Sequence, residues 1–267
     1  MRQGAGVEFS ARYVALGDSF TEGLGDTDPT RPNQVCGWAD RAAEQLALAH
    51  PEQSWGYANL AIRGKKMNQI LSEQIAAAVA MNPTLVTIYA GINDILRPKV
   101  DIDAMMGRYS DGLATLAATG ARVLVFTGFD ASTSKIFASI RGRTAIYNEL
   151  LREVAQDHGA ELVDYWRFRE YNDWRLWGID RMHMSTAGHI NMANRVLEQL
   201  GETVRISMPE LPPLPVRTTS ETLKDNAAWT KEYVGPWVSR RLRGVSSGDN
   251  LSARWPTLRS PLALNSH

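Results

Sequence analysis

The sequence has few of the features that mark secreted or membrane-bound chains. Cys36 is the only cysteine among 267 residues, so an internal disulfide is excluded and a reducing compartment is expected. No stretch approaches the ~20 apolar residues of a membrane span. Residues 1–6 lack the apolar segment of a secretion signal. These absences predict a cytoplasmic protein with no membrane span.

An excess of charge of one sign is also missing. The 29 Lys and Arg balance the 29 Asp and Glu, which leaves a formal net charge of +0. This balance gives no bulk attraction to nucleic acid or to an anionic membrane, so neither is expected as a partner. The sequence contains no P-loop, no Cys/His zinc pattern and no calcium loop. We therefore expect no cofactor and no metal.

Short apolar runs alternate with helical patterns over the first 200 residues. The runs predict strands at 13–16, 57–62, 85–89, 122–126 and 161–164. The helical patterns cover 37–49, 68–80, 101–119, 141–158 and 187–200, with Asp101 and Ser185 or Thr186 as expected N-caps. This repetition predicts a five-stranded parallel sheet between two layers of helices.

The pattern ends in a proline-rich segment, and a different composition follows it. We expect a catalytic domain over 1–206, an extended linker over 207–215 and a C-terminal extension over 216–267. The extension contains three tryptophans and a basic run at 240–243, and 225–242 could form an amphipathic helix that Pro236 interrupts. We expect it to pack on the core or on a second copy of the chain, which would make a homodimer.

Two short motifs carry the chemistry. Ser19 lies in Gly17-Asp18-Ser19-Phe20, directly after the first predicted strand, and Asp180 and His183 share one loop before the last helix. An attacking hydroxyl needs a base to take its proton, and that base needs a partner that fixes its tautomer. Ser19, His183 and Asp180 are therefore the candidate nucleophile, base and orienting acid.

Two further loops supply candidates for an oxyanion hole. Gly64 follows the second predicted strand, and Asn93 follows the third. Ligands collect beyond the carboxyl ends of parallel strands, so these residues should meet Ser19 at one sheet edge. The amides of Ser19 and Gly64 and the side chain of Asn93 are the expected donors.

The four segments together resemble the sequence blocks of the SGNH (GDSL) hydrolases. They occur in order as Gly17-Asp18-Ser19-Phe20, Gly64, Gly91-Ile92-Asn93-Asp94 and Asp180-Arg181-Met182-His183. The resemblance spans about residues 10–200 and implies a flavodoxin-like α/β/α sandwich and ester hydrolysis. The extension is similar to those of actinobacterial members, on weaker grounds. The expected substrate is a small or medium acyl ester, or an O-acetyl group on a sugar.

Other interpretations stay open or fail on context. A second serine motif, Gly244-Val245-Ser246-Ser247-Gly248, follows no strand and is not expected to be catalytic. The same scaffold could serve an acyltransferase or a non-catalytic module that binds an acyl ligand or a partner. His189 and Cys36 are expected to be packed residues. The tryptophans of the loop before Asp180 could pack or could form a wall of the acyl pocket: Trp166, Trp174 and Trp177.

Overall fold

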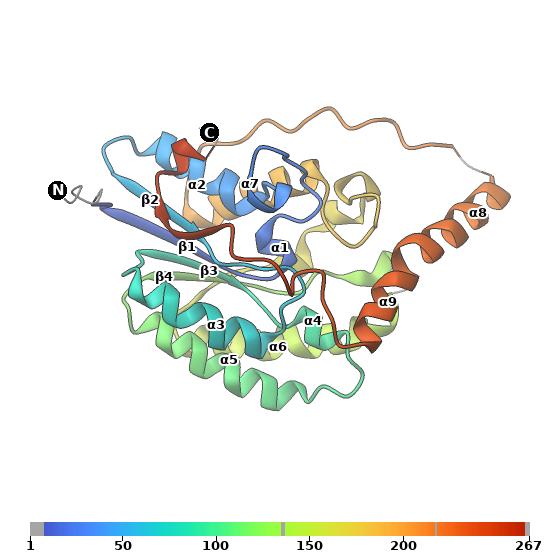
Figure 1. Ribbon diagram of the computed structural model, residues 1–267, viewed down its shortest axis with the longest axis horizontal. Helices are drawn as coiled ribbons and strands as arrows, with labels where there is room; N and C mark the ends of the chain where they lie inside the picture. The colour runs from blue at the N-terminus through green and yellow to red at the C-terminus, as the bar shows by residue number, and fades with distance from the viewer. Residues whose placement is uncertain (1–7, 135–136, 217, 265–267) are drawn as a thin grey trace.

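The chain forms a sheet with helices on both faces, as a computed structural model shows (Figure 1). The structure describes residues 8–134, 137–216 and 218–264. The outer ends of the predicted domains, residues 1 and 267, lie outside this range. The division into domains remains a prediction.

Six strands form one sheet within the described residues, in the order β5-β4-β3-β1-β2-β6. The first five are parallel, as predicted, and their order is that of the flavodoxin-like folds. The strands are β1 (Ala11–Gly17), β2 (Trp55–Asn59), β3 (Leu85–Tyr89), β4 (Arg122–Phe126), β5 (Glu161–Val163) and β6 (Trp255–Arg259). The predicted bounds of the third and fourth strands are confirmed.

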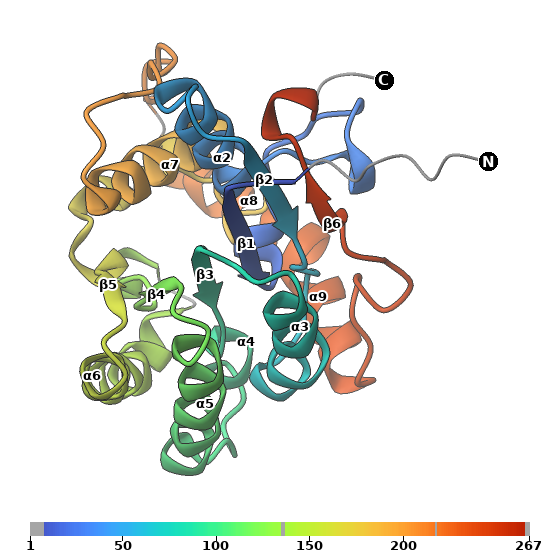
Figure 2. The ribbon, with the colours of Figure 1, turned by 90° about the vertical axis from the view of Figure 1, so that its left-hand side faces the viewer.

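Two helical layers cover the sheet, and they occupy opposite sides of it in Figure 2. One contains α2 (Trp38–Ala49) and α7 (Thr186–Leu200), and the other contains α3 (Met67–Ala80), α5 (Ile102–Ala117) and α6 (Arg141–Asp157). The side chains of β1 alternate between the layers. Tyr13 and Ala15 belong to the core beneath α2 and α7, whereas Val14 and Leu16 belong to the core beneath α3, α5 and α6. The predicted three-layer α/β/α fold is confirmed.

The second strand ends earlier than predicted. β2 stops at Asn59, although apolar residues continue to Ile62. The Asn59 side chain explains the end of the strand, because its Oδ1 accepts a hydrogen bond from the amide of Ala61 at 3.1 Å. This bond turns the chain away from the sheet and towards the Gly64 loop.

The extension contributes an edge strand, which the sequence analysis did not predict. β6 pairs antiparallel with β2, and the register places Trp255 opposite Asn59 and Arg259 opposite Tyr57. Pro256 lies within β6, where its missing N–H is tolerated because the strand is at the sheet edge. The sheet therefore has one strand more than the five expected.

The helical part of the extension is longer than predicted. α8 (Thr219–Trp229) leads through a π-helical turn at Thr230–Val234 into α9 (Gly235–Leu242). Pro236 does not interrupt this segment. It is the second residue of α9 and lies just after the π-helical turn, where the regular α-helical hydrogen bonds are already interrupted. The side chains of Arg241 and Leu242 lie outside the described residues.

A buried ion pair ties the extension to the core. Arg254 donates from both terminal nitrogens to the Asp40 carboxylate of α2, at 2.7 and 2.9 Å, and both side chains are fully buried. Arg31 reaches the same carboxylate at 2.7 Å, and Tyr57 donates to it at 2.8 Å. Burial alone would raise the pKa of Asp40, but these cations and hydrogen bonds lower it.

The homodimer expected from the sequence stays a prediction.

Candidate active site

Ser19 lies at the carboxyl end of the central strand. It is the first residue of α1 (Ser19–Glu22), and the Asp18 carboxylate caps this helix by accepting from Phe20 N at 3.1 Å. Gln74 of α3 fixes the strand end below it, since its side-chain amide bonds both the N–H and the C=O of Gly17, at 2.8 and 2.9 Å. Gly17 has φ +146°, and a Cβ there would lie 2.7 Å from Tyr89 O. The turn that presents Ser19 is therefore rigidly held.

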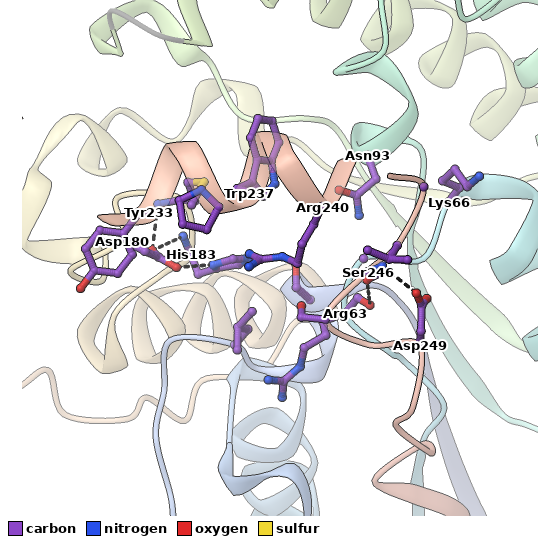
Figure 3. Close-up of a pocket in the computed structure, with 18 of the residues that line it drawn as sticks. Arg63, Lys66, Asn93, Asp180, His183, Tyr233, Trp237, Arg240, Ser246 and Asp249 are labelled. Atoms are coloured by element: carbon purple, nitrogen blue, oxygen red, sulfur yellow. Dashed lines mark hydrogen bonds and ion pairs between the residues drawn. The ribbon is translucent and has the colours of Figure 1, made fainter. Parts of the chain in front are cut away.

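A short hydrogen bond joins Asp180 and His183 on the loop before α7 (Figure 3). The Asp180 Oδ2 lies 2.5 Å from His183 Nδ1, and its Oδ1 accepts from the amides of Met182 and His183 at 3.0 Å each. Burial would raise the pKa of Asp180, but its hydrogen bonds with His183 and these amides lower it. The carboxylate therefore stays ionised and fixes the orientation of the imidazole. It contacts Nδ1, so Nε2 is the ring nitrogen that remains for Ser19.

Ser19 and His183 both line one cavity with two lobes. The larger lobe, of about 460 Å³, also contains Gly64, Asn93 and Asp180. The smaller lobe, of about 110 Å³, is lined mainly by apolar side chains. Among the described residues no hydrogen bond joins Ser19 to His183. The structure thus brings all five residues of the predicted constellation to one cavity.

Gly64 lies in a loop and Asn93 lies in a short helix, and polar contacts hold both in place. The Arg63 guanidinium pairs with the buried Glu22 at 2.7 Å, and Arg63 N also donates to this carboxylate. Gly64 has φ +77°, a backbone conformation that glycine adopts readily. Asn93 follows β3 in α4 (Ile92–Ile95), and its Nδ2 donates to Asp18 Oδ2 at 2.9 Å and to Lys65 O at 3.1 Å.

Asp18 is the buried acid next to the candidate nucleophile. Burial raises its pKa to about 7, although the amide of Phe20 and the nearby His183 act in the opposite direction. Its two oxygens accept from Phe20 N and from Asn93, as expected for a residue that fixes loop hydrogen bonds. The charge beside Ser19 can therefore change near neutral pH.

The extension forms one wall of the site, and the sequence analysis missed this role. Tyr233, Trp237 and Arg240 line the larger lobe together with the catalytic candidates (Figure 3). Ser246, from the rejected serine motif, donates to Arg63 O at 3.2 Å and packs behind Gly64. The only signal in the sequence was the cluster of tryptophans and arginines after the linker.

The remaining histidine and cysteine candidates are packed residues. His189 accepts from Trp38 N through Nδ1 and contacts Leu24 O through Nε2, both at 3.2 Å, and it is fully buried. Burial raises the pKa of Cys36 to about 12, which makes it a poor nucleophile. Of the three loop tryptophans, only Trp177 lines the smaller lobe, while Trp174 is exposed.

No cluster of three His, Cys, Asp or Glu suited to a metal ion occurs among the described residues. Among the helices that the structure describes, none combines the length and the apolar composition needed to cross a membrane.

Comparisons with known proteins bear on the family and the fold of the chain. The model of the GDSL-like lipase/acylhydrolase family matches residues 15–189, which is more than half of the chain. Among solved structures, LAE5 from the metagenome of Lake Arreo, Spain, is 23% identical, with a TM-score of 0.61 over 72% of this chain and 96% of that one. Axe2, an acetylxylan esterase from Geobacillus stearothermophilus, is 20% identical, with a TM-score of 0.60 over 73% and 96%. A search of curated proteins found no match.

Proposed function

The chain belongs to the GDSL-like lipase/acylhydrolase family and is a carboxylic-ester hydrolase, and we propose that it works through Ser19, His183 and Asp180 and an acyl-enzyme. One observation carries this proposal. The hydrogen-bonded pair of Asp180 and His183 opens onto the cavity that Ser19 lines at the end of β1. A half-buried ionised acid, an oriented imidazole and a serine at a rigid turn are the parts that acyl transfer requires.

In the proposed reaction His183 moves one proton in each direction. Ser19 Oγ attacks the ester carbonyl carbon while His183 Nε2 takes the hydroxyl proton, and Asp180 stabilises the imidazolium. The bond from the carbonyl carbon to the leaving oxygen then breaks, and His183 returns the proton to that oxygen. Water attacks the acyl-enzyme by the same route, which releases the acid and restores Ser19.

Three donors would stabilise the tetrahedral oxyanion. Ser19 is the first residue of α1, where amides lack an acceptor within the helix. Gly64 would present its amide from the loop that Arg63 and Glu22 hold. Asn93 would exchange one of its present acceptors, Asp18 or Lys65 O, for the oxyanion. Each donor is expected to contribute about 3 kcal/mol to the transition state.

The proposed substrate is a small or medium acyl ester or an O-acetyl group on a sugar. The small volume of the apolar lobe supports a short acyl chain. The structural similarity to Axe2, described as an acetylxylan esterase, supports the second possibility. Transfer to an alcohol in place of water would use the same acyl-enzyme, and product analysis with competing alcohols separates the two reactions.

Three serines line the cavity, and two of them, Ser19 and Ser246, provide a matched test. We expect Ser19→Ala to lower kcat/KM for p-nitrophenyl acetate by about 10⁴-fold or more and to abolish labelling by a fluorophosphonate. Ser246→Ala should keep labelling and most of the activity. Turnover that persists in Ser19→Ala, or a label found on Ser246, would show that the mechanism is wrong and would favour a non-catalytic role for Ser19.

A further inference from the structure

The two lobes that meet at Ser19 and His183 have different chemistry. The smaller, which we call the apolar lobe, is lined by Phe20, Ile92, Leu96, Phe129, Phe137 and Trp177. The larger, which we call the polar lobe, contains cationic side chains from three separate elements: Lys66, Arg97 and Arg240. A substrate whose ester bond lies at Ser19 would therefore place an apolar part in one lobe and a polar part in the other.

The cations of the polar lobe have unused donors. No ion pair joins Lys66, Arg97 or Arg240 to any acid among the described residues, and Arg97 Nε is buried without a hydrogen-bond partner there. Arg240 reaches from α9 into the lobe between His183 and Ser246 (Figure 3). A buried donor without an acceptor is costly, so a ligand that supplies oxygen acceptors is favoured at this position.

The acids of the same lobe are already engaged. Asp180 bonds His183 and two amides, and Asp249 accepts from Ser246 N at 2.7 Å. Glu232 accepts from the Tyr233 hydroxyl. Arg63 is neutralised by Glu22. The side chains that can still donate hydrogen bonds to a ligand are therefore cationic, although acidic side chains also line the lobe.

We propose that the polar lobe binds an oxyanion, a phosphate or a carboxylate, on the alcohol half of the substrate. This proposal rests on the proposed function, because it assigns the two halves of an ester to the two sides of Ser19. The acyl chain occupies the apolar lobe and is transferred to Ser19 Oγ. The alcohol leaves from the polar lobe with its anionic group and the proton returned by His183. Arg240 is the main specificity-determining residue, and Lys66 and Arg97 assist it.

A matched pair of substrates tests this assignment. We expect kcat/KM for 1-butyryl-glycerol 3-phosphate to exceed that for 1-butyryl-glycerol by roughly 10- to 100-fold, as a charge-assisted hydrogen bond implies. Arg240→Gln should reduce this ratio to near one. Arg243→Gln removes the same charge from an exposed residue of the same segment that does not line the lobe, and it should leave the ratio unchanged. A second variant, Lys66→Gln, should lower the ratio in part even if Arg240→Gln folds poorly.

Inhibition provides a readout that does not depend on turnover of these esters. We expect glycerol 3-phosphate or glycerate to compete with p-nitrophenyl acetate and glycerol not to compete, and Arg240→Gln should remove the competition. Inhibition by only one of the two anions identifies the group that the lobe recognises. Equal kcat/KM for the charged and neutral esters, or no inhibition by either anion, would overturn the proposal. If Ser19→Ala retained turnover, the proposed function itself would fail instead.

Discussion

Trp229 Nε1 donates a hydrogen bond to the main-chain oxygen of Asp180 at 2.8 Å. Trp229 closes α8 in the extension, and Asp180 is the candidate acid of the active site. The next residue, Arg181, stacks on the Trp229 ring at 5.1 Å and donates to Asn226 at 2.7 Å. Arg181 has φ +53°, an unfavourable conformation for a residue with a side chain, so these contacts stabilise a loop that would otherwise relax. The extension therefore positions the pair of Asp180 and His183.

Replacing this tryptophan should impair catalysis more than binding. Trp229→Phe keeps a ring for Arg181 but removes the N–H donor, so we expect kcat for p-nitrophenyl acetate to fall by roughly 3- to 10-fold with little change in KM. Trp229→Leu removes both contacts and should lower kcat further. Trp174→Phe, at an exposed position of the adjoining loop, is the matched control. An unchanged kcat in Trp229→Leu would show that the extension does not position the loop.

Loss of the buried Arg254 should destabilise the whole protein. Arg254→Met leaves the buried Asp40 carboxylate with fewer partners, so we expect the free energy of unfolding to fall by about 3–5 kcal/mol. Denaturant titration followed by tryptophan fluorescence measures this change. Arg259→Met, at the exposed end of β6, the strand that follows Arg254, should cost well under 1 kcal/mol. The double variant Asp40→Leu/Arg254→Met should recover part of the loss, and failure to recover any would contradict a dominant role for the unpaired charge.

Gly64 should tolerate no side chain, for two separable reasons. A Cβ there would lie 1.9 Å from Ser246 Oγ, and φ +77° disfavours any other residue. We expect Gly64→Ala to lower kcat by about 100-fold, the effect of a displaced oxyanion donor. Ser246→Gly alone should have a small effect. When Ser246→Gly is combined with Gly64→Ala, it removes the clash with Ser246 Oγ but not the backbone strain. Activity should therefore return only in part. Full activity in Gly64→Ala would exclude its amide from the oxyanion hole.

Local patterns were sufficient to predict the central fold. The residues of β3 and β4 form near-continuous apolar runs because helices cover both faces of these strands, and such runs have clear ends. The position of Ser19 followed from the same logic, since a parallel sheet gathers its loops at one edge. These inferences depend only on residues close to one another in the sequence.

The role of the extension could not be predicted, because it depends on contacts between distant residues. β6 is short, contains Pro256 and exposes most of its side chains, so no apolar run marks it as a strand. Its place at the sheet edge depends on the pairing of Arg254 with Asp40, 214 residues apart in sequence. In the sequence Arg240 is only one residue of a basic run, and only the tertiary structure places it at the cavity. The wall that the extension forms at the active site could not be predicted for the same reason, because it too depends on contacts between distant residues.

His189 should make the stability of the protein depend on pH in the acid range. Burial lowers its pKa to about 4 from 6.5, and its Nδ1 must stay unprotonated to accept from Trp38 N. The unfolded chain binds this proton at higher pH than the folded chain does. The contribution of the neutral His189 to the free energy of unfolding is therefore complete above about pH 6.5. It is lost as the pH falls towards 4, by about 3 kcal/mol in total.

Comparison with a neutral substitute isolates this effect. His189→Gln does not titrate, so the difference in unfolding free energy between wild type and variant should shrink by about this amount between pH 7 and pH 4. His50 gives a control of opposite sign. Its hydrogen bond with Glu202 raises its pKa, so its contribution should be lost as the pH rises and His50→Gln should remove that loss. A wild-type minus His189→Gln difference that stays constant from pH 7 to pH 4 would mean that the buried imidazole does not resist protonation.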